Sequence, residues 1–433
     1  MPPGVAPQGP GRAVGLRLRW RCGDVCRTTR RRAATGHDGR VIDFIAGPNL
    51  SLCELLAATG AVTLVAARWL PAAARPYAAV AASALLAVST AVLAVTGIRW
   101  QLLPVLAGAA LALPFALSPA LRPLLGRLPG RRLGRRPGEV RRVQPAVLPR
   151  PRGGRVRRWL AVAGSAGCLA LIATGPVAAW AFPVPQFPEP SGPFAVGTRV
   201  VQWTDAARPE TFTPDPDDRR TVVVQLWYPA RPVPSGAPRA RYLGRTEQEA
   251  RTVRDALAGT AGLPGFLLDG ATRARSRAVC DAPVADGGGR FPLVLFSPGS
   301  GGVRTQNTAW AEELASHGYA VAALDHPYDS AAVVLDDGRT IRSATASTGD
   351  RDADEVLAAD WTAIRAADLG FVLDRLEGLD RGEYPGDPLT GRLDTGRTAV
   401  AGHSMGGAAA LQAARHDARF AAALDLDGFP HGP

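Results

Sequence analysis

The stretch RTAVAGHSMGGAAALQAA, from Arg397 to Ala414, decides the fold of this chain. A short apolar run leads into GHSMG at 402–406, and an alanine-rich segment typical of a helix follows. A serine on a tight turn between a strand and a helix needs glycine two positions before and two positions after it, because a side chain there would clash with the strand or the helix. Gly402 and Gly406 meet that requirement. The stretch therefore predicts a nucleophile elbow in which Ser404 is the nucleophile.

Strand-like runs and helical patterns alternate around the elbow, which predicts a mostly parallel α/β sheet. Two early runs with no helix between them predict an antiparallel start to that sheet. A polar, arginine-rich segment at 235–290 is expected to form an insertion over the site. The strand-like runs lie at 197–203, 221–229, 292–297, 319–325, 398–402 and 421–427, and the helical patterns lie at about 305–317, 355–379 and 405–416.

A second glycine-rich turn, FSPGSGG at 296–302, directly follows the run PLVLF. In such a sheet, the loop after this strand supplies one N–H of the oxyanion hole, and the residue after the nucleophile supplies the other. These donors are expected to be the N–H groups of Ser300 and Met405. His403 is adjacent to Ser404, so the backbone points it away from the hydroxyl, and we expect it to be structural.

Four apolar stretches precede the sheet, at about 50–67, 78–97, 102–121 and 159–182. Each is about long enough to cross ~30 Å of hydrocarbon as a helix. Tryptophans lie at their edges, as in membrane-interface anchors. We therefore expect residues 49–182 to be an all-α membrane region with about four helices, the alternative being a buried helical bundle of a soluble domain.

The arginines indicate an orientation. Thirteen of them fall between Arg122 and Arg158, which favours a cytoplasmic loop and an extracytoplasmic chain after Phe182. Three spans before that loop would place the N-terminus outside, against the nine arginines of residues 1–40. Either the basic tail, residues 1–48, results from a mis-assigned start, which we favour, or one early span does not cross. The span at 159–182 also resembles a signal peptide, but we interpret it as an anchor because other spans precede it.

Composition excludes several classes of site. The net charge of +12 is concentrated in these arginine-rich stretches, which lack a nucleic-acid-binding pattern, so we expect no nucleic-acid partner. Cys22 and Cys26 have a metal-like spacing, but no second pair completes a site. We expect neither a metal nor another cofactor.

Seven segments, in order from about 187 to 430, resemble the platelet-activating factor acetylhydrolases of the plasma, isoform II type, and their bacterial relatives. Bacterial cutinase-like polyesterases are similar to a lesser degree. The resemblance implies an α/β-hydrolase fold over residues 183–433 and a Ser–Asp–His triad. The segments are EPSGPFAVGT, VVVQLWYPA, PLVLFSPGSGGVRT, LASHGYAVAALDH, ADLGFVLDRLEGL, AGHSMGG and ALDLDGFP.

The resemblance matches Ser404 to the nucleophile and Asp427 to the acid, while Asp425 on the same strand fits the motif less well. None of the six histidines fits the base, which the family places after a later strand. His431 follows Asp427 too closely, and His326 is expected at the site rim, in possible contact with substrate. We therefore expect a chain truncated before the catalytic histidine, with an incomplete C-terminal sheet edge.

The function implied is a membrane-anchored serine esterase that faces out of the cell. It would hydrolyse short-acyl phospholipids or related short esters through an acyl-enzyme. One alternative is a polyesterase or general carboxylesterase. Another is a membrane protein with a degenerate, non-catalytic hydrolase domain, which the absent histidine would support.

Overall fold

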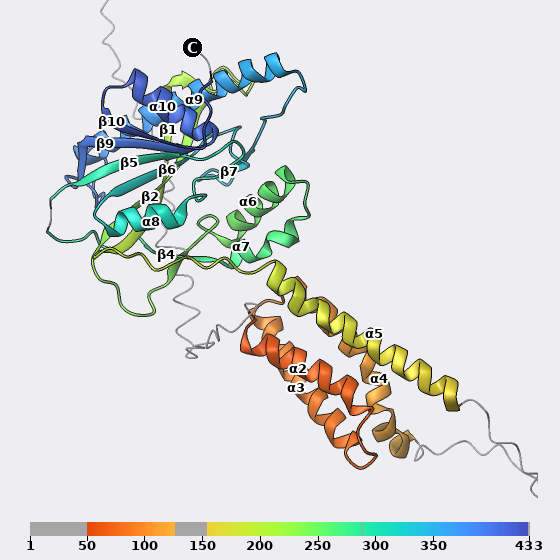
Figure 1. Cartoon of the computed structure of the whole chain (residues 1–433). Helices are drawn as coiled ribbons and strands as arrows, with labels where there is room; N and C mark the ends of the chain where they lie inside the picture. Colours follow the sequence, from red (N-terminus) through yellow and green to blue (C-terminus); the bar gives the residue numbers. More distant parts are fainter. Residues whose placement is uncertain (1–49, 126–153, 288, 432–433) are drawn as a thin grey trace, which may run out of the picture. The chain divides into compact units, whose positions relative to one another are not determined.

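The computed structural model describes residues 50–125, 154–287 and 289–431 (Figure 1). The chain divides into two compact units. We call the described part of Asp38–Val184 the helical unit, and the described part of Pro185–Pro433 the sheet unit. The basic tail, the Cys22/Cys26 pair and most of the arginine-rich loop lie outside the described residues.

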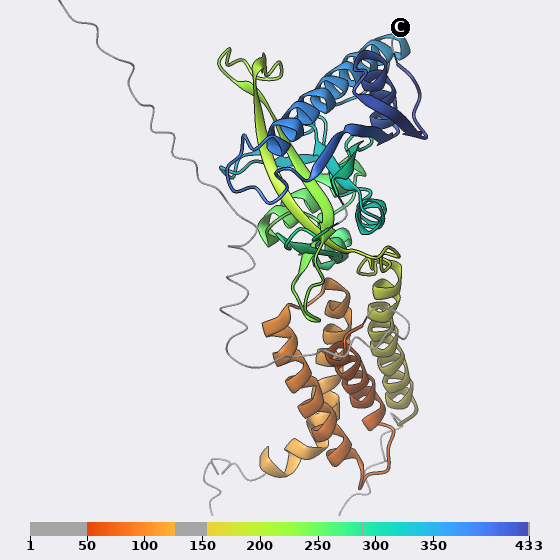
Figure 2. The same ribbon diagram turned by 90° about the vertical axis from the view of Figure 1, so that its left-hand side faces the viewer.

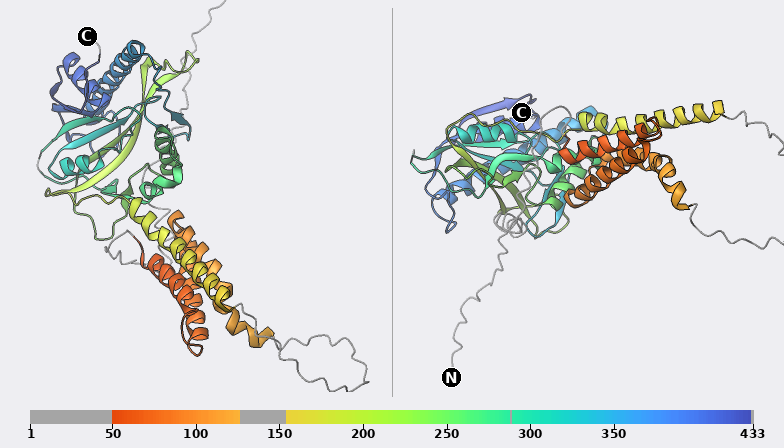
Figure 3. Two further views of the ribbon diagram at one scale, coloured as in Figure 1. Left: turned by 45° about the vertical axis from the view of Figure 1, so that its right-hand side comes forward. Right: turned by 90° about the horizontal axis from the view of Figure 1, so that it is seen from below.

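The described part of the helical unit consists of helices packed side by side (Figures 1 and 3). Ser51 caps the first helix in a capping box with Glu54. Glycines allow close helix contacts, since a Cβ on Gly175 would lie 2.8 Å from the carbonyl oxygen of Gln101. The helices are α2 (Leu52–Ala67), α3 (Arg75–Thr96), the 3₁₀ turn η1 (Trp100–Leu102), α4 (Leu103–Leu125) and α5 (Gly154–Ala181).

Among the described residues, three segments are long and apolar enough to cross a membrane: Arg75–Thr96, Trp100–Ser118 and Arg155–Ala181. The first predicted span forms α2, which has only 16 residues. That length corresponds to about 24 Å. Many apolar side chains of these helices face outward, including Val95 (89% exposed) and Trp159 (71%). This surface is what lipid-facing helices present.

The sheet unit contains an eight-stranded mixed sheet in the order β10-β9-β5-β6-β2-β1-β4-β3. The early strands β1 and β2 form the long antiparallel pair seen in Figure 2, and β5, β6, β9 and β10 run parallel. Both features match the sequence expectation. The strands are β1 (Ala195–Pro209), β2 (Arg219–Ala230), β3 (Arg239–Arg241), β4 (Arg275–Cys280), β5 (Phe291–Ser297), β6 (Ala320–Asp325), β9 (Leu393–His403) and β10 (Phe420–Leu426).

Helices cover both faces of this sheet, which is the arrangement of an α/β hydrolase-like fold (Figure 1). α9 (Arg351–Asp380) and α10 (Met405–His416) pack on the face that carries Leu293 and Leu295. α8 (Thr308–Ser316) packs on the other face, against Val294 and Phe296. The alternating side chains of β5 therefore contribute to two cores, and the elbow lies at the end of β9, where the chain enters α10.

The segment 235–290 is not a single insertion. Part of it, β3 and β4, extends the sheet beyond β1. Between these strands lie α6 (Glu247–Thr260), η2 (Gly265–Leu268) and α7 (Asp269–Arg273). The end of α6 approaches the loop after β5, since a Cβ on Gly301 would lie 3.8 Å from Thr260 Cγ2. A small hairpin of β7 (Ala332–Val334) and β8 (Thr340–Arg342) completes the unit.

Candidate active site

Ser404 occupies the turn between β9 and α10 with a strained backbone. Its φ is 53° and its ψ is −128°, in a region that a residue with a side chain rarely adopts. A Cβ on Gly402 would lie 2.0 Å from the carbonyl oxygen of Gly406, and a Cβ on Gly406 would lie 2.1 Å from that of Ser297. Both glycines are therefore required by direct contact of backbone with backbone, as the motif predicts.

The loop after β5 lies beside this turn. A Cβ on Gly299 would lie 3.5 Å from Ser404 Cβ. The N–H of Gly299 donates to Gln306 Oε1 at 3.0 Å, and the N–H of Gly301 donates to Asp329 Oδ1 at 3.4 Å. Between them, the N–H of Ser300 has no acceptor within the part of the chain that the structure describes.

Met405 supplies a second uncommitted donor. It is the first residue of α10, where the N–H groups of a helix lack partners within the helix. Its N–H has no acceptor among residues 50–125, 154–287 and 289–431. The two backbone donors that the sequence singles out, at Ser300 and Met405, thus remain unused next to Ser404.

His403 does not bond to the neighbouring hydroxyl. Its Nδ1 lies 3.0 Å from Gln306 Nε2, so the amide of Gln306 donates to the ring. The same Gln306 side chain accepts the N–H of Gly299. Gln306 therefore ties the loop after β5 to the elbow, and His403 has the structural role that its position predicts.

The two candidate acids differ in what they bind. The N–H of Ser404 donates to the carbonyl of Leu426 at 2.9 Å, which fixes the elbow to the end of β10. Asp425 Oδ1 accepts the N–H of Gly428 at 2.8 Å. Asp427 follows the strand, is exposed, and has a positive φ of 61°. One carboxylate oxygen of Asp425 is thus bonded to the local turn, whereas the carboxylate of Asp427 has no hydrogen bond to the described residues.

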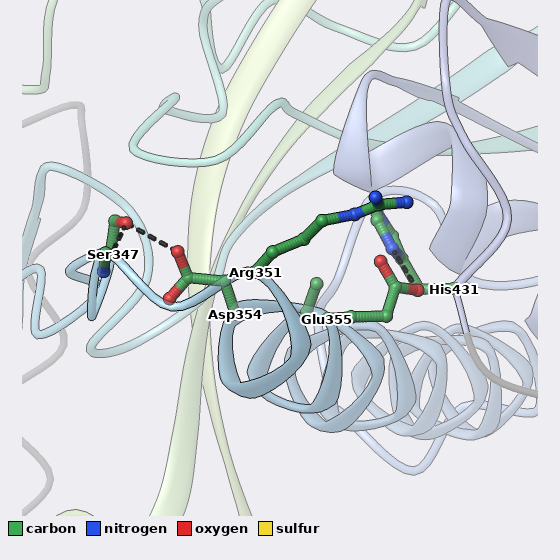
Figure 4. A pocket seen from close by; sticks show the side chains of 7 residues that line it. Ser347, Arg351, Asp354, Glu355 and His431 are labelled. Carbon is green, nitrogen blue, oxygen red and sulfur yellow. Dashed lines mark hydrogen bonds and ion pairs between the residues drawn. The ribbon is translucent and has the colours of Figure 1, made fainter.

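No histidine of the described residues hydrogen-bonds to Ser404. His431 Nδ1 pairs with Glu355 Oε1 of α9 at 3.1 Å, in a surface pocket that Figure 4 shows. His317 pairs with Glu313, and His416 is exposed at the end of α10. In the described part of the chain, none of these three histidines is thus a partner of Ser404.

The position of His326 differs from the expectation. Its side chain is 0% exposed, so it does not line an open rim. Its ring is enclosed between Ser297 at the end of β5 and Asp368 on α9, and both of these partners are distant in the sequence. A contact with substrate would require these bonds to open.

The residues that form the sheet unit also match a known protein family. The family model of platelet-activating factor acetylhydrolase, isoform II, matches residues 180–431. The chain belongs to this family. The match spans the sheet, the elbow and the loop after β5.

The individual relatives that match this chain have low sequence identity to it. It is 28% identical over 255 residues to the probable 1-alkyl-2-acetylglycerophosphocholine esterase of Arthroderma benhamiae, covering 56% of this chain and 58% of that protein. It is 31% identical over 170 residues to the platelet-activating factor acetylhydrolase of Canis lupus familiaris, covering 33% and 36%. The matches therefore span a little over half of the fungal relative and about a third of the mammalian one.

Among solved structures, the ferulic acid esterase from Streptomyces cinnamoneus is 35% identical to this acetylhydrolase family member. The alignment covers 58% of this chain and 65% of that structure, with a TM-score of 0.46.

A buried chain of hydrogen bonds lies beneath the elbow of this acetylhydrolase family member. Ser297 Oγ lies 2.9 Å from His326 Nε2, and His326 Nδ1 lies 2.8 Å from Asp368 Oδ2. The order serine–histidine–aspartate is that of a catalytic triad. All three residues are 0% exposed, so no substrate reaches Ser297. The arrangement is therefore a structural element of the interior.

The charges of this hydrogen-bonded trio depend on burial and on the neighbouring arginines. Burial lowers the pKa of His326, so its ring is neutral and donates from Nδ1 to Asp368. Burial opposes the ionisation of Asp368, but the charge of Arg220, together with bonds from His326 and Arg220, holds the pKa of this carboxyl well below its usual range. Asp368 is thus an anion paired with Arg220 and Arg208.

Sequence reasoning missed the residues that support the site. These are Gln306, Asp329, Arg365 and Asp368, whose partners lie far away in the sequence. One signal was present. Arg365 and Asp368 share the apolar face of the helical pattern with Leu369, Val372 and Leu376, and a charge on such a face requires a buried partner.

Proposed function

We propose that the protein is a serine ester hydrolase that acts on short-acyl phospholipids or related short esters. The observation that carries the proposal is the elbow itself. Ser404 is held at a positive φ beside two unused backbone donors, the N–H groups of Ser300 and Met405. An oxyanion hole uses such donors. The names of the fungal and mammalian relatives point to an acetyl ester of a glycerophospholipid as the substrate class.

The proposed reaction has two steps. Ser404 Oγ attacks the ester carbonyl carbon while a base removes its proton, and the carbonyl oxygen becomes an anion that the two N–H groups bind. The base returns the proton to the departing alcohol oxygen, which leaves an acyl group on Ser404. Water then attacks this acyl-enzyme, the acid is released, and the Ser404 hydroxyl is restored.

Asp427 is the proposed acid of the triad. It follows the strand next to the elbow, and its carboxylate is open, whereas Asp425 is bound to Gly428. Its partner would be the base histidine, which we assign to none of the described histidines. The buried His326 is excluded from that role by its bonds to Ser297 and Asp368.

We further propose that the helical unit anchors the enzyme in the cell membrane, with the sheet unit extracytoplasmic. The three long apolar segments support an anchor. The thirteen arginines between Arg122 and Arg158 support a cytoplasmic loop before α5, which then leads the chain outward.

The test uses the complete gene product in detergent micelles, with p-nitrophenyl acetate as the first substrate. The wild type is expected to hydrolyse it, and Ser404→Ala is expected to lower kcat at least ~10⁴-fold. Ser347→Ala, an exposed serine of the pocket in Figure 4, is the matched control and is expected to keep full activity. Equal activity of wild type and Ser404→Ala would refute the proposal. A phospholipid series with 2-acyl chains of increasing length then tests the substrate class, and a preference for long chains would contradict it.

A further inference from the structure

Arg365, on α9, is a fully buried cation close to the elbow. Its side chain and that of Asp329 are both 0% exposed. Arg365 Nη2 donates to Asp329 Oδ1 at 2.6 Å, and Nε donates to the other carboxylate oxygen, Oδ2. This two-point pairing fixes the plane of the guanidinium group. A guanidinium group in the interior is costly unless its remaining N–H groups are also bonded.

The remaining N–H groups of Arg365 all bind the start of the loop after β5. They donate to the carbonyl oxygen of Pro298, to the carbonyl oxygen of Gly299 at 3.2 Å and to Ser297 Oγ at 3.2 Å. One side chain thus contacts three consecutive residues. These residues lead directly into Ser300.

The bond to Gly299 fixes the direction of the Ser300 N–H. The carbonyl of Gly299 and the N–H of Ser300 belong to one planar trans peptide unit, in which they point in opposite directions. Since the carbonyl faces Arg365 in the interior, the N–H faces away from it, on the side of the elbow. Asp329 holds the next peptide unit too, because its Oδ1 accepts the N–H of Gly301 at 3.4 Å.

We propose that the Arg365–Asp329 pair is a positioning device for the oxyanion hole, which rests on the proposed esterase function. Among the described residues, Arg365 forms no hydrogen bond with Ser404. It acts through the peptide unit between Gly299 and Ser300. Without it, that peptide unit can rotate and turn its N–H away from the developing oxyanion.

The first test compares Arg365→Lys with Arg304→Lys in the complete gene product. Lysine keeps the charge but has only three N–H donors, all on one nitrogen, so it cannot replace the two-point pairing with Asp329 together with the bonds to Ser297, Pro298 and Gly299. Loss of one oxyanion donor lowers kcat about 10²–10³-fold, and we expect that loss with KM changed less than about twofold. Arg304 is the matched control because it is equally buried and pairs with Asp325 and Glu249, with no side-chain bond to the loop carbonyls. An equal loss of kcat in both variants would overturn the proposal.

A second readout does not depend on activity. Crystal structures of the wild type and Arg365→Lys are expected to show the Gly299–Ser300 peptide unit turned in the variant only. An unchanged peptide unit in a folded Arg365→Lys protein would overturn the positioning role. If the wild type hydrolyses no ester, the proposed function fails, and these structures alone decide the positioning role.

Asp329→Asn keeps the proposal testable if Arg365→Lys does not fold. Asparagine preserves the shape of Asp329 but removes the charge that holds the guanidinium group. It is expected to lower kcat by less than Arg365→Lys does, again with KM nearly constant. A variant with wild-type kcat and a wild-type melting temperature would contradict the proposal.

Discussion

At the scale of single residues, the elbow is built by contacts between backbone atoms. The carbonyl oxygens of Ser297 and Pro298 lie where any side chain on Gly406 would start. Neither oxygen can move without shifting β5 and the loop that carries Ser300. The glycines around Ser404 thus maintain the geometry of both the proposed nucleophile and the proposed oxyanion hole.

Gly406→Ala tests this contact. The new Cβ would lie 2.1 Å from the carbonyl oxygen of Ser297 and 2.4 Å from that of Pro298, so we expect the free energy of unfolding to fall by about 1–3 kcal/mol. The effect should appear although alanine favours helices. Gly259→Ala is the control, because that helical glycine has nothing within 4 Å of an added Cβ. Its stability in a urea melt should rise by up to about 1 kcal/mol, and a matching rise for Gly406→Ala would contradict the argument.

His326 predicts a dependence of stability on pH. Its pKa is lowered in the folded protein, whereas the unfolded chain takes up a proton below pH ~6.5. The unfolded state therefore binds more protons as the pH falls below ~6.5, and the free energy of unfolding should decrease there. Urea melts between pH 5 and 7 should show this slope, and His326→Gln should flatten it. His416→Gln, at an exposed position, is the comparison, and an equal flattening there would refute the assignment.

At the scale of helices and strands, the alternation of strand-like runs and helical patterns in the sequence predicted most of the sheet. β5, β6 and β10 differ from the expected runs by at most one residue at either end, because their apolar residues follow directly from burial. The turn at Ser404 could be predicted because only glycine fits at positions 402 and 406. Segment 235–290 was not readable, since β3 has only three residues, two of them arginine, and pairs with β4.

The residues that support the site could not be predicted from sequence periodicity. Arg365 contacts Asp329, 36 positions away, and Gly299, 66 positions away. Periodicity reveals that a charged residue lies on an apolar face, but it does not reveal the partner. His326 was likewise expected at the site rim because it follows β6, but its partner on α9 could not be predicted from the sequence. The packing of α9 encloses its side chain.

The edge strand β10 gives a prediction at this scale. It pairs only with β9 within the described sheet, and Ala421–Leu424 are exposed. Unpaired strand edges promote association between chains, so residues 183–433 expressed alone are expected to aggregate. Leu424→Lys should raise the monomer fraction in size-exclusion chromatography. Leu411→Lys, which changes an exposed leucine on α10, should not. A cooperative melt of the unmodified segment as a monomer would contradict the prediction.

At the scale of the whole molecule, one ion pair is relevant to the proposed membrane topology. Arg99, after α3, lies 3.6 Å from Glu54, in the first turn of α2, and both are buried. The start of α2 therefore lies at the same end of the helical unit as the end of α3. If the loop after α4 is cytoplasmic, as proposed, this end would face outward and residue 50 would lie outside. The pair itself shows only that the two helix ends lie together, and α2 alone is short for a full crossing.

Reporter fusions test this topology in cells. Green fluorescent protein inserted between residues 126 and 153 is expected to fluoresce, since that loop is proposed to be cytoplasmic. Alkaline phosphatase fused after Gly97 or after Val184 is expected to be active, since both sites are proposed to lie outside. Active phosphatase at the 126–153 site would reverse the proposed orientation, and activity at all three sites would rule out a membrane-spanning helical unit.

The buried Ser297–His326–Asp368 chain has a consequence for how enzymes are found by computation. A template search that matches three side chains by their interatomic distances would return this trio, with bonds of 2.9 and 2.8 Å, and would label Ser297 instead of the proposed nucleophile. Ser404 has no such trio and would be passed over. Distances alone would therefore select a serine that is 0% exposed, because they ignore the path for substrate. Backbone strain and free amide donors are the more discriminating search terms for this family.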